Sequence, residues 1–166
     1  MIIPTKEECL KILKENNVPD NVIAHSKKVH EVAMKLCDML DKKGVNSNKD
    51  LVIAAALLHD VAKLTKGDHV INGSELVKSL GFPEVARIIS RHGLAHLDDE
   101  ELQPKSTEEK IVFYADKRVS NDRFVSLEDR FKYIKERYKS KNIDDEFKFT
   151  KEIEKELIGD GNINLH

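Results

Sequence analysis

The chain has 166 residues, and its 28 Lys and Arg residues nearly balance its 30 Asp and Glu residues, giving a formal net charge of −2 at pH 7. This length predicts one domain, 1–166, with a buried core, and the balanced charge argues against a nucleic-acid partner or an anionic membrane surface. The longest apolar run, Leu51 to Leu58, is too short to span a bilayer, and Cys9 and Cys37 have no Cys-x-x-Cys spacing. We therefore expect a soluble cytoplasmic protein that contacts no membrane and has no disulfide framework.

Helical periodicity covers most of the chain and no segment alternates like a strand, so the sequence predicts an all-α fold. The predicted helices are, in chain order, Lys6–Asn16, Asp20–Lys42, Lys49–Leu64, Val70–Leu80, Pro83–His92, one capped by Ser106 that ends near Val119, Leu127–Lys139 and Asp145–Leu157. The third is apolar nearly all round and is expected to be central, with Ser47 and Asp50 as its capping box. Residues 94–105 are predicted to form a surface loop and residues 159–166 a frayed tail.

Two adjacent residues that can bind a metal, His59 and Asp60, follow the apolar run of the central helix. A charge emerging from an apolar element needs compensation, which a metal ion or a paired basic residue would supply. His25 lies on the apolar face of its own helix, where a histidine is more often an ordinary core residue than a ligand. Asp116 also lies on an apolar face, and buried carboxylates need partners. The four residues together indicate a mixed nitrogen–oxygen metal site.

The order His25, His59-Asp60, Asp116 resembles the His…His-Asp…Asp signature of HD-domain metal-dependent phosphohydrolases, over about residues 20–120. The resemblance implies an HD-domain bundle of about seven or eight helices, with one metal bound by these four residues. Residues 59–63, His-Asp-Val-Ala-Lys, are similar to the His-Asp-Ile-Gly-Lys element of one subgroup. By that likeness Lys63 would contact the substrate phosphate, although a lysine near a helix C-terminus is also favourable by itself.

Two further histidines resemble those of the dinuclear members of this family. His69 is followed by Gly73 in a His-x-x-x-Gly stretch, and His92 ends a predicted helix. They are expected either to hold a second metal with Asp60 as the bridge, or to contact phosphate around a single ion. Mixed imidazole and carboxylate ligands suit iron, manganese or zinc, and also cobalt or nickel, whereas they suit magnesium less well.

Four other residues are candidates for substrate binding: Arg91, His96, Lys117 and Arg118. Each also has an ordinary explanation, because basic residues near helix ends are commonly solvated and His96 lies in a polar loop. We keep both interpretations open for these residues.

The residues and the resemblance together predict hydrolysis of a phosphate ester or anhydride by metal-activated water, with Asp60 and Lys63 as the catalytic residues. The expected substrate is a nucleotide or a related small phosphate compound. Small bacterial members, including diadenosine-tetraphosphate hydrolases, look nearest, and the Gly-Tyr-Pro motif of the cyclic-dinucleotide branch is absent from the sequence. The alternatives are a regulatory module that binds metal or nucleotide without catalysis, and a structural helical interaction domain.

The C-terminal third carries no motif that can be interpreted. Residues 121–158 form a predicted helical extension, which is expected to cap the pocket, complete the core or form a homodimer interface.

Overall fold

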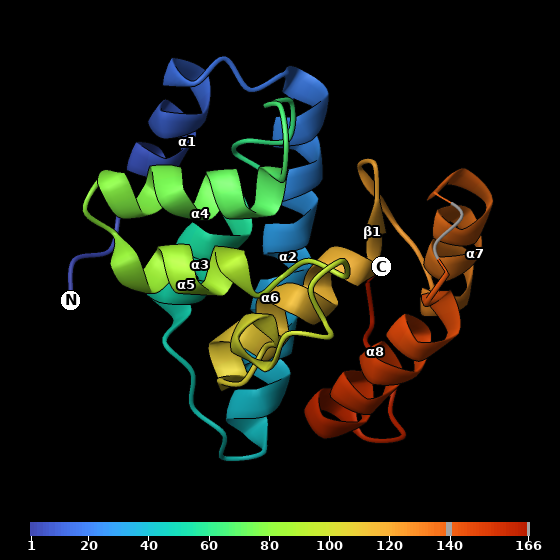
Figure 1. The fold of residues 1–166 in the computed structure, drawn as a ribbon. Helices are drawn as coiled ribbons and strands as arrows, with labels where there is room; N and C mark the ends of the chain where they lie inside the picture. The colour runs from blue at the N-terminus through green and yellow to red at the C-terminus, as the bar shows by residue number, and fades with distance from the viewer. Residues whose placement is uncertain (139–140, 166) are drawn as a thin grey trace.

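The computed structural model describes residues 1–138 and 141–165 (Figure 1). Its α-helices are α1 (Lys6–Glu15), α2 (Asp20–Lys42), α3 (Lys49–Leu58), α4 (His69–Ser79), α5 (Pro83–Ser90), α6 (Thr107–Lys117), α7 (Leu127–Tyr138) and α8 (Ile143–Ile158). The all-α prediction is confirmed. The predicted end of the seventh helix, Lys139, lies outside the described residues. Among the helices that are described, none is long and apolar enough to cross a bilayer.

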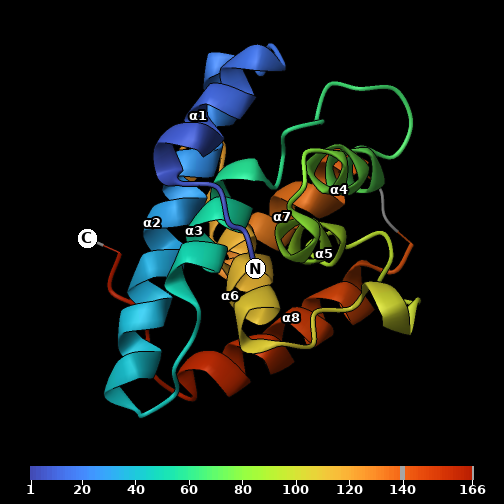
Figure 2. The same ribbon diagram turned by 90° about the vertical axis from the view of Figure 1, so that its left-hand side faces the viewer.

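The apolar helix α3 lies at the centre of the bundle, as predicted. It packs against α1, α2, α5 and α6, and all but one of the residues from Leu51 to Leu58 are buried. The long helix α2 runs along one side of α3 and also contacts α6, while α4 and α5 lie side by side (Figures 1 and 2). Helix α8 packs on α2 and α6, and α7 packs on α8. The core therefore fixes the end of α3 relative to α2, α5 and α6.

Helix α3 is shorter than predicted and begins with a different cap. It ends at Leu58, and residues 59–66 continue as tight turns in which Val61 N–H donates to Leu58 O and Lys63 N–H donates to Asp60 O. The apolar sequence continues through these turns, so periodicity alone could not show where the helix stops. At its start Asn48, rather than Ser47 with Asp50, accepts a hydrogen bond from Leu51 N–H at 3.1 Å. The Ser47 hydroxyl donates to Cys37 Sγ instead.

Two other parts of the chain differ from the prediction. The loop between α6 and α7 forms a small hairpin of β1 (Val119–Ser120) and β2 (Arg123–Phe124), turning at Asn121 with φ 55°. Strands of two residues are too short to show alternation, and asparagine tolerates the left-handed conformation that the turn requires. The loop after α5 contains one 3-10 turn, η1 (Glu100–Leu102).

The C-terminal tail packs on the core instead of fraying. Ile163 and Leu165 are each only 7% exposed, and Lys35 Nζ donates to Asn164 O at 2.9 Å. The expectation of a frayed tail is therefore wrong for these residues, because two apolar side chains near the end of a polar segment are enough to hold it against the bundle.

A buried ion pair joins the end of α5 to the start of α6. Glu109 is the third residue of α6, and its side chain accepts hydrogen bonds from the backbone N–H groups of Lys105 and Ser106 and from Arg91 Nη1, all within 3.0 Å. Burial alone would raise the pKa of Glu109, but these donors outweigh it and lower the pKa below the ordinary value of 4.5.

We expect Glu109→Gln to lower the free energy of unfolding by about 2 kcal/mol at neutral pH, because Arg91 loses its charged partner. The pKa of Glu109 is lower in the folded state than in the unfolded state. The stabilisation that ionised Glu109 contributes is therefore complete above pH 4.5 and is lost as the pH falls through the folded-state pKa. Urea titrations at pH 7 and at lower pH should show the difference between the two proteins shrinking in acid. Glu152→Gln, on the exposed surface of α8, is the control and should change little at either pH. A difference that does not vary with pH would contradict this account.

Candidate functional site

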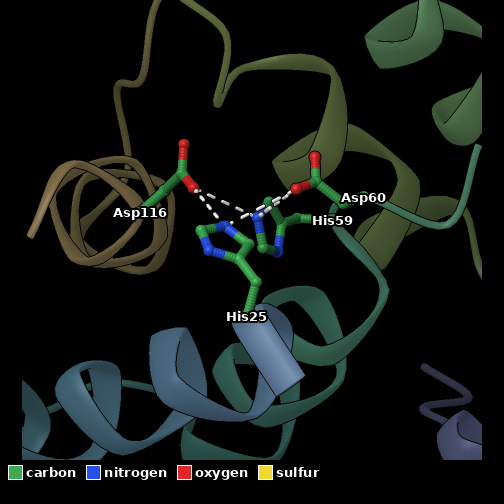
Figure 3. A group of neighbouring side chains, drawn as sticks. All are labelled: His25, His59, Asp60 and Asp116. Atoms are coloured by element: carbon green, nitrogen blue, oxygen red, sulfur yellow. Dashed lines mark hydrogen bonds and ion pairs between the residues drawn. The ribbon is translucent and has the colours of Figure 1, made fainter. Parts of the chain in front are cut away.

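Four side chains from three parts of the fold converge in the core (Figure 3). His25 comes from α2, His59 and Asp60 follow the end of α3, and Asp116 lies in the last turn of α6. One ligand atom from each lies within 4.8 Å of the others, and all four residues are buried. His25 Nε2 and His59 Nε2 are 3.1 and 3.2 Å from Asp116 Oδ1, and they are 3.5 and 3.3 Å from Asp60 Oδ2. Two imidazole nitrogens and two carboxylate oxygens gathered in this way can hold a metal ion.

The histidines are oriented by backbone carbonyl groups. In each ring Nδ1 donates a hydrogen bond to a carbonyl oxygen: His25 to Asn121 (2.7 Å), His59 to Ala56 (2.7 Å) and His92 to Ile89 (2.6 Å). Because a carbonyl can only accept, the proton must be on Nδ1, and Nε2 is the nitrogen turned toward the carboxylates. This is the arrangement that metal-binding histidines adopt in proteins.

The charges in the cluster also suit a cation. Burial would lower the pKa of His59, but the neighbouring carboxylates of Asp60 and Asp116 outweigh that effect and raise the pKa to about 10. Burial alone would raise the pKa of Asp60. Its interactions with His59 and His92 outweigh this effect and hold the pKa well below the ordinary value. Two ionised carboxylates are thus compensated by a proton on an imidazole. A bound cation would supply the same compensation, so the residues present fit a metal ion.

Lys117 forms an ion pair with the second carboxylate oxygen of Asp116. Its side chain is buried, and Nζ donates to Asp116 Oδ2 at 2.8 Å and to His92 O at 2.9 Å. Nζ also lies 4.5 Å from the centre of the Phe113 ring. Burial lowers the pKa of this ammonium group. Lys117 therefore positions Asp116 and ties α6 to the end of α5, and a substrate contact would require it to give up these partners.

The cluster opens into a cavity of about 460 Å³, a size that suits a small molecule. His25, Asp60 and Asp116 line it on the side of the cluster, and so does His92. His69, at the start of α4, lies in its wall. Five of the six residues expected to bind metal therefore line the cavity. The sixth, His59, is fully buried and does not line it.

The two oxygens of Asp60 face different histidines. Oδ2 faces His25 and His59, whereas Oδ1 lies 3.8 Å from Nε2 of His92. Asp60 thus lies between His25 and His59 on one side and His92 on the other. Lys63 Nζ lies 3.7 Å from Asp60 Oδ2, and the Lys63 side chain is 46% exposed at the cavity.

Of the other residues expected to bind substrate, His96 lines the cavity and the two arginines do not. His96 lines the cavity and forms a hydrogen bond with the Asp68 carboxylate. Arg91 is held by Glu109, and it is not among the residues that line the cavity. Arg118 is also outside that lining, because its Nε donates to Val125 O at 2.7 Å and its Nη1 to the Tyr114 hydroxyl. These two arginines therefore join elements of the fold, which favours the ordinary structural explanation over the substrate contact that was also expected.

Sequence reasoning gave capping of the pocket as one possible role of residues 121–158, but it identified none of the α7 residues that line the cavity. Arg130, Ile134 and Tyr138 line it, although no motif marks their segment. Their spacing of four residues is the signal that could have indicated a shared face. Many amphipathic helices show the same spacing, so it does not by itself indicate a site.

The comparison with known protein families agrees with this geometry. The family model of the HD domain matches residues 22–120, which contain all six expected metal ligands. The chain therefore belongs to the HD domain family, a superfamily of metal-dependent phosphohydrolases.

Three relatives show how this similarity is distributed. A tRNA (cytidine(56)-2'-O)-methyltransferase of Picrophilus torridus is 36% identical over 93% of this chain and 47% of its own length. An uncharacterized protein of Methanocaldococcus jannaschii is 35% identical over 79% of this chain and 85% of its own length. A dihydroneopterin 2',3'-cyclic phosphate phosphodiesterase of the same organism is 32% identical over 64% of this chain and 49% of its own length. The chain thus spans about half the length of the first and third relatives.

Metal binding should stabilise the fold measurably. Mn²⁺ at about 100 times its dissociation constant is expected to stabilise the metal-stripped protein by about 2.7 kcal/mol, which corresponds to a rise in Tm of about 5–10 °C. Asp116→Asn should reduce this rise strongly at the same concentration, because it removes one negatively charged ligand. Scanning fluorimetry with and without Mn²⁺ measures the effect. Asp98→Asn, an exposed aspartate outside the cavity, is the control, and a full shift in Asp116→Asn would contradict the assignment.

Proposed function

We propose that this protein hydrolyses a phosphate ester or anhydride of a nucleotide or a related small molecule, using a divalent cation held by His25, His59, Asp60 and Asp116. The observation that carries the proposal is the buried set of two histidines and two aspartates that opens into a cavity with cationic side chains in its wall. Bound there, a divalent cation would supply Lewis acidity, which lowers the pKa of water and offsets negative charge on phosphoryl oxygens.

The chain's own residues have distinct roles in this proposal. His25 and His59 keep their Nε2 atoms directed at the cluster, because their Nδ1 atoms are fixed by backbone carbonyls. With a single cation bound, Asp60 is the candidate to accept a proton from the attacking water, since its Oδ1 is turned away from His25 and His59. Lys63 reaches the cavity with a partly exposed ammonium group that can donate to a phosphoryl oxygen as charge develops there.

A second cation position is part of the proposal. His92 faces Asp60 Oδ1, and His69 lines the same cavity, so Asp60 is placed to bridge two ions. If one ion binds, His69 and His92 are left to contact phosphate. The mixed ligands favour iron, manganese or zinc, with cobalt or nickel also suitable and magnesium less so.

A relative adds one class of compound to the candidate substrates. The M. jannaschii protein named for dihydroneopterin 2',3'-cyclic phosphate is a phosphodiesterase, so cyclic phosphodiesters join nucleotides as candidate substrates for this chain. The methyl transfer named for the P. torridus relative is an activity of a protein about twice as long. The cavity of this chain is lined by candidate metal ligands and cations, which supports hydrolysis rather than methyl transfer.

Elemental analysis and an activity panel test the proposal together. Protein purified without chelator is expected to contain one or two transition-metal ions per chain and to release product from at least one of a panel of nucleotides, dinucleoside polyphosphates and 2',3'-cyclic phosphates. Asp60→Ala should lose both the metal and the hydrolysis, because Asp60 contacts both groups of histidines. Asp122→Asn, on the exposed hairpin, should keep both.

Each result separates the competing functions. Two ions per chain would favour a bridging role for Asp60, and one ion would return His69 and His92 to phosphate binding. Metal without any hydrolysis on the panel would favour a regulatory binding module. No metal after reconstitution with iron, manganese and zinc would refute the proposal and favour a structural interaction domain.

A further inference from the structure

One face of α7 lines the cavity with three residues, each four positions after the last: Arg130, Ile134 and Tyr138. Residues four apart lie on the same side of an α-helix, and a rise of about 1.5 Å per residue separates the first and last of these Cα atoms by about 12 Å. This face lies outside residues 22–120, which match the family. Membership of the family therefore assigns it no role.

Arg130 brings to the cavity wall a buried hydrogen-bond donor without a partner among the described residues. Its Nε is buried and has no hydrogen-bond partner within the described part of the chain. Leaving a buried donor unsatisfied is unfavourable, so such a group is expected to have a partner in the working protein. Lys63 and Lys117, the other lysine or arginine residues of the cavity wall, have carboxylate partners within 4 Å.

The chemistry of an arginine suits an anionic ligand at this place. A guanidinium group presents several N–H donors in one plane and matches phosphate oxygens geometrically. An anion bound beside Arg130 would satisfy the buried Nε–H group that has no partner within the described residues.

The outer end of the same face is apolar and aromatic. Ile134 is buried, while Tyr138, which also lines the cavity, is 64% exposed. Val70 and Leu94 line the cavity too, which adds apolar surface to its wall. An exposed phenol ring next to apolar surface is suited to stack on a planar heterocycle. The face thus offers a phosphate-binding group at one end and a ring-binding group at the other.

We propose that this face of α7 recognises the substrate, with Arg130 binding a phosphate group and Tyr138 stacking on a planar ring attached to it. The proposal rests on the phosphohydrolase function proposed above, because that function places a phosphate in this cavity. It goes further in assigning recognition to a helix beyond the family region and in requiring a planar ring in the substrate.

Calorimetric titration with inorganic phosphate and with AMP tests both contacts on the metal-loaded protein. Arg130→Gln should weaken the binding of both probes about tenfold or more, because a charge-assisted contact is lost. Tyr138→Ala should weaken AMP about tenfold and leave phosphate within about twofold, since only the ring loses its stacking partner. Lys132→Gln removes an exposed positive charge from the same helix outside the cavity and should leave both affinities within about twofold.

Metal content and Tm are measured on every variant. If Arg130→Gln melts at a lower temperature, Arg130→Lys takes its place, and it should still weaken phosphate severalfold because a lysine lacks the planar set of donors. Phosphate binding with wild-type affinity in these variants would overturn the proposal for Arg130, and unchanged AMP affinity in Tyr138→Ala would overturn it for the ring. A wild-type protein that binds phosphate through Arg130 but hydrolyses nothing on the panel would refute the proposed function and leave this inference standing.

Discussion

Two carboxylates, Asp60 and Asp116, lie inside a helical core, and much of the surrounding structure serves to compensate their charge. An ionised carboxylate buried without partners costs several kcal/mol, which is a large part of the stability of a domain. Here the compensation comes from His25 on α2, His59 after α3 and Lys117 on α6. Each compensating group belongs to a different element, so the helices are held in one arrangement for as long as the charges remain inside.

The ends of helices supply the orientation that this cluster needs. The last carbonyl groups of a helix have no partner within the helix. At the end of α3 the carbonyl of Ala56 accepts the Nδ1 proton of His59, three residues later, and the carbonyl of Ile89 does the same for His92 at the end of α5. The same local geometry thus fixes two imidazole rings against backbone carbonyl groups at helix ends.

The sequence predicted the members of the cluster better than the arrangement around them. His25, His59 and Asp116 could be found because each interrupts an apolar pattern, and the family signature links them. The structural positions of Arg91 and Arg118 could not be predicted, because their partners depend on how loops return to the helices. The hairpin, the packed tail and the cavity-lining face of α7 likewise depend on contacts between segments distant in the chain, which local periodicity does not record.

If α7 recognises the substrate, recognition depends on a different part of the fold from the candidate metal ligands. Helix α7 reaches the bundle through α8, which is anchored by Ile153 and Leu157 and by the hydrogen bond from the Tyr114 hydroxyl to Glu154. A change in the packing of α8 would therefore move Arg130 relative to the cluster without altering any of the candidate metal ligands. Substitutions under α8 would accordingly change which substrate is bound, while substitutions in the central helices would change whether a cation is bound at all.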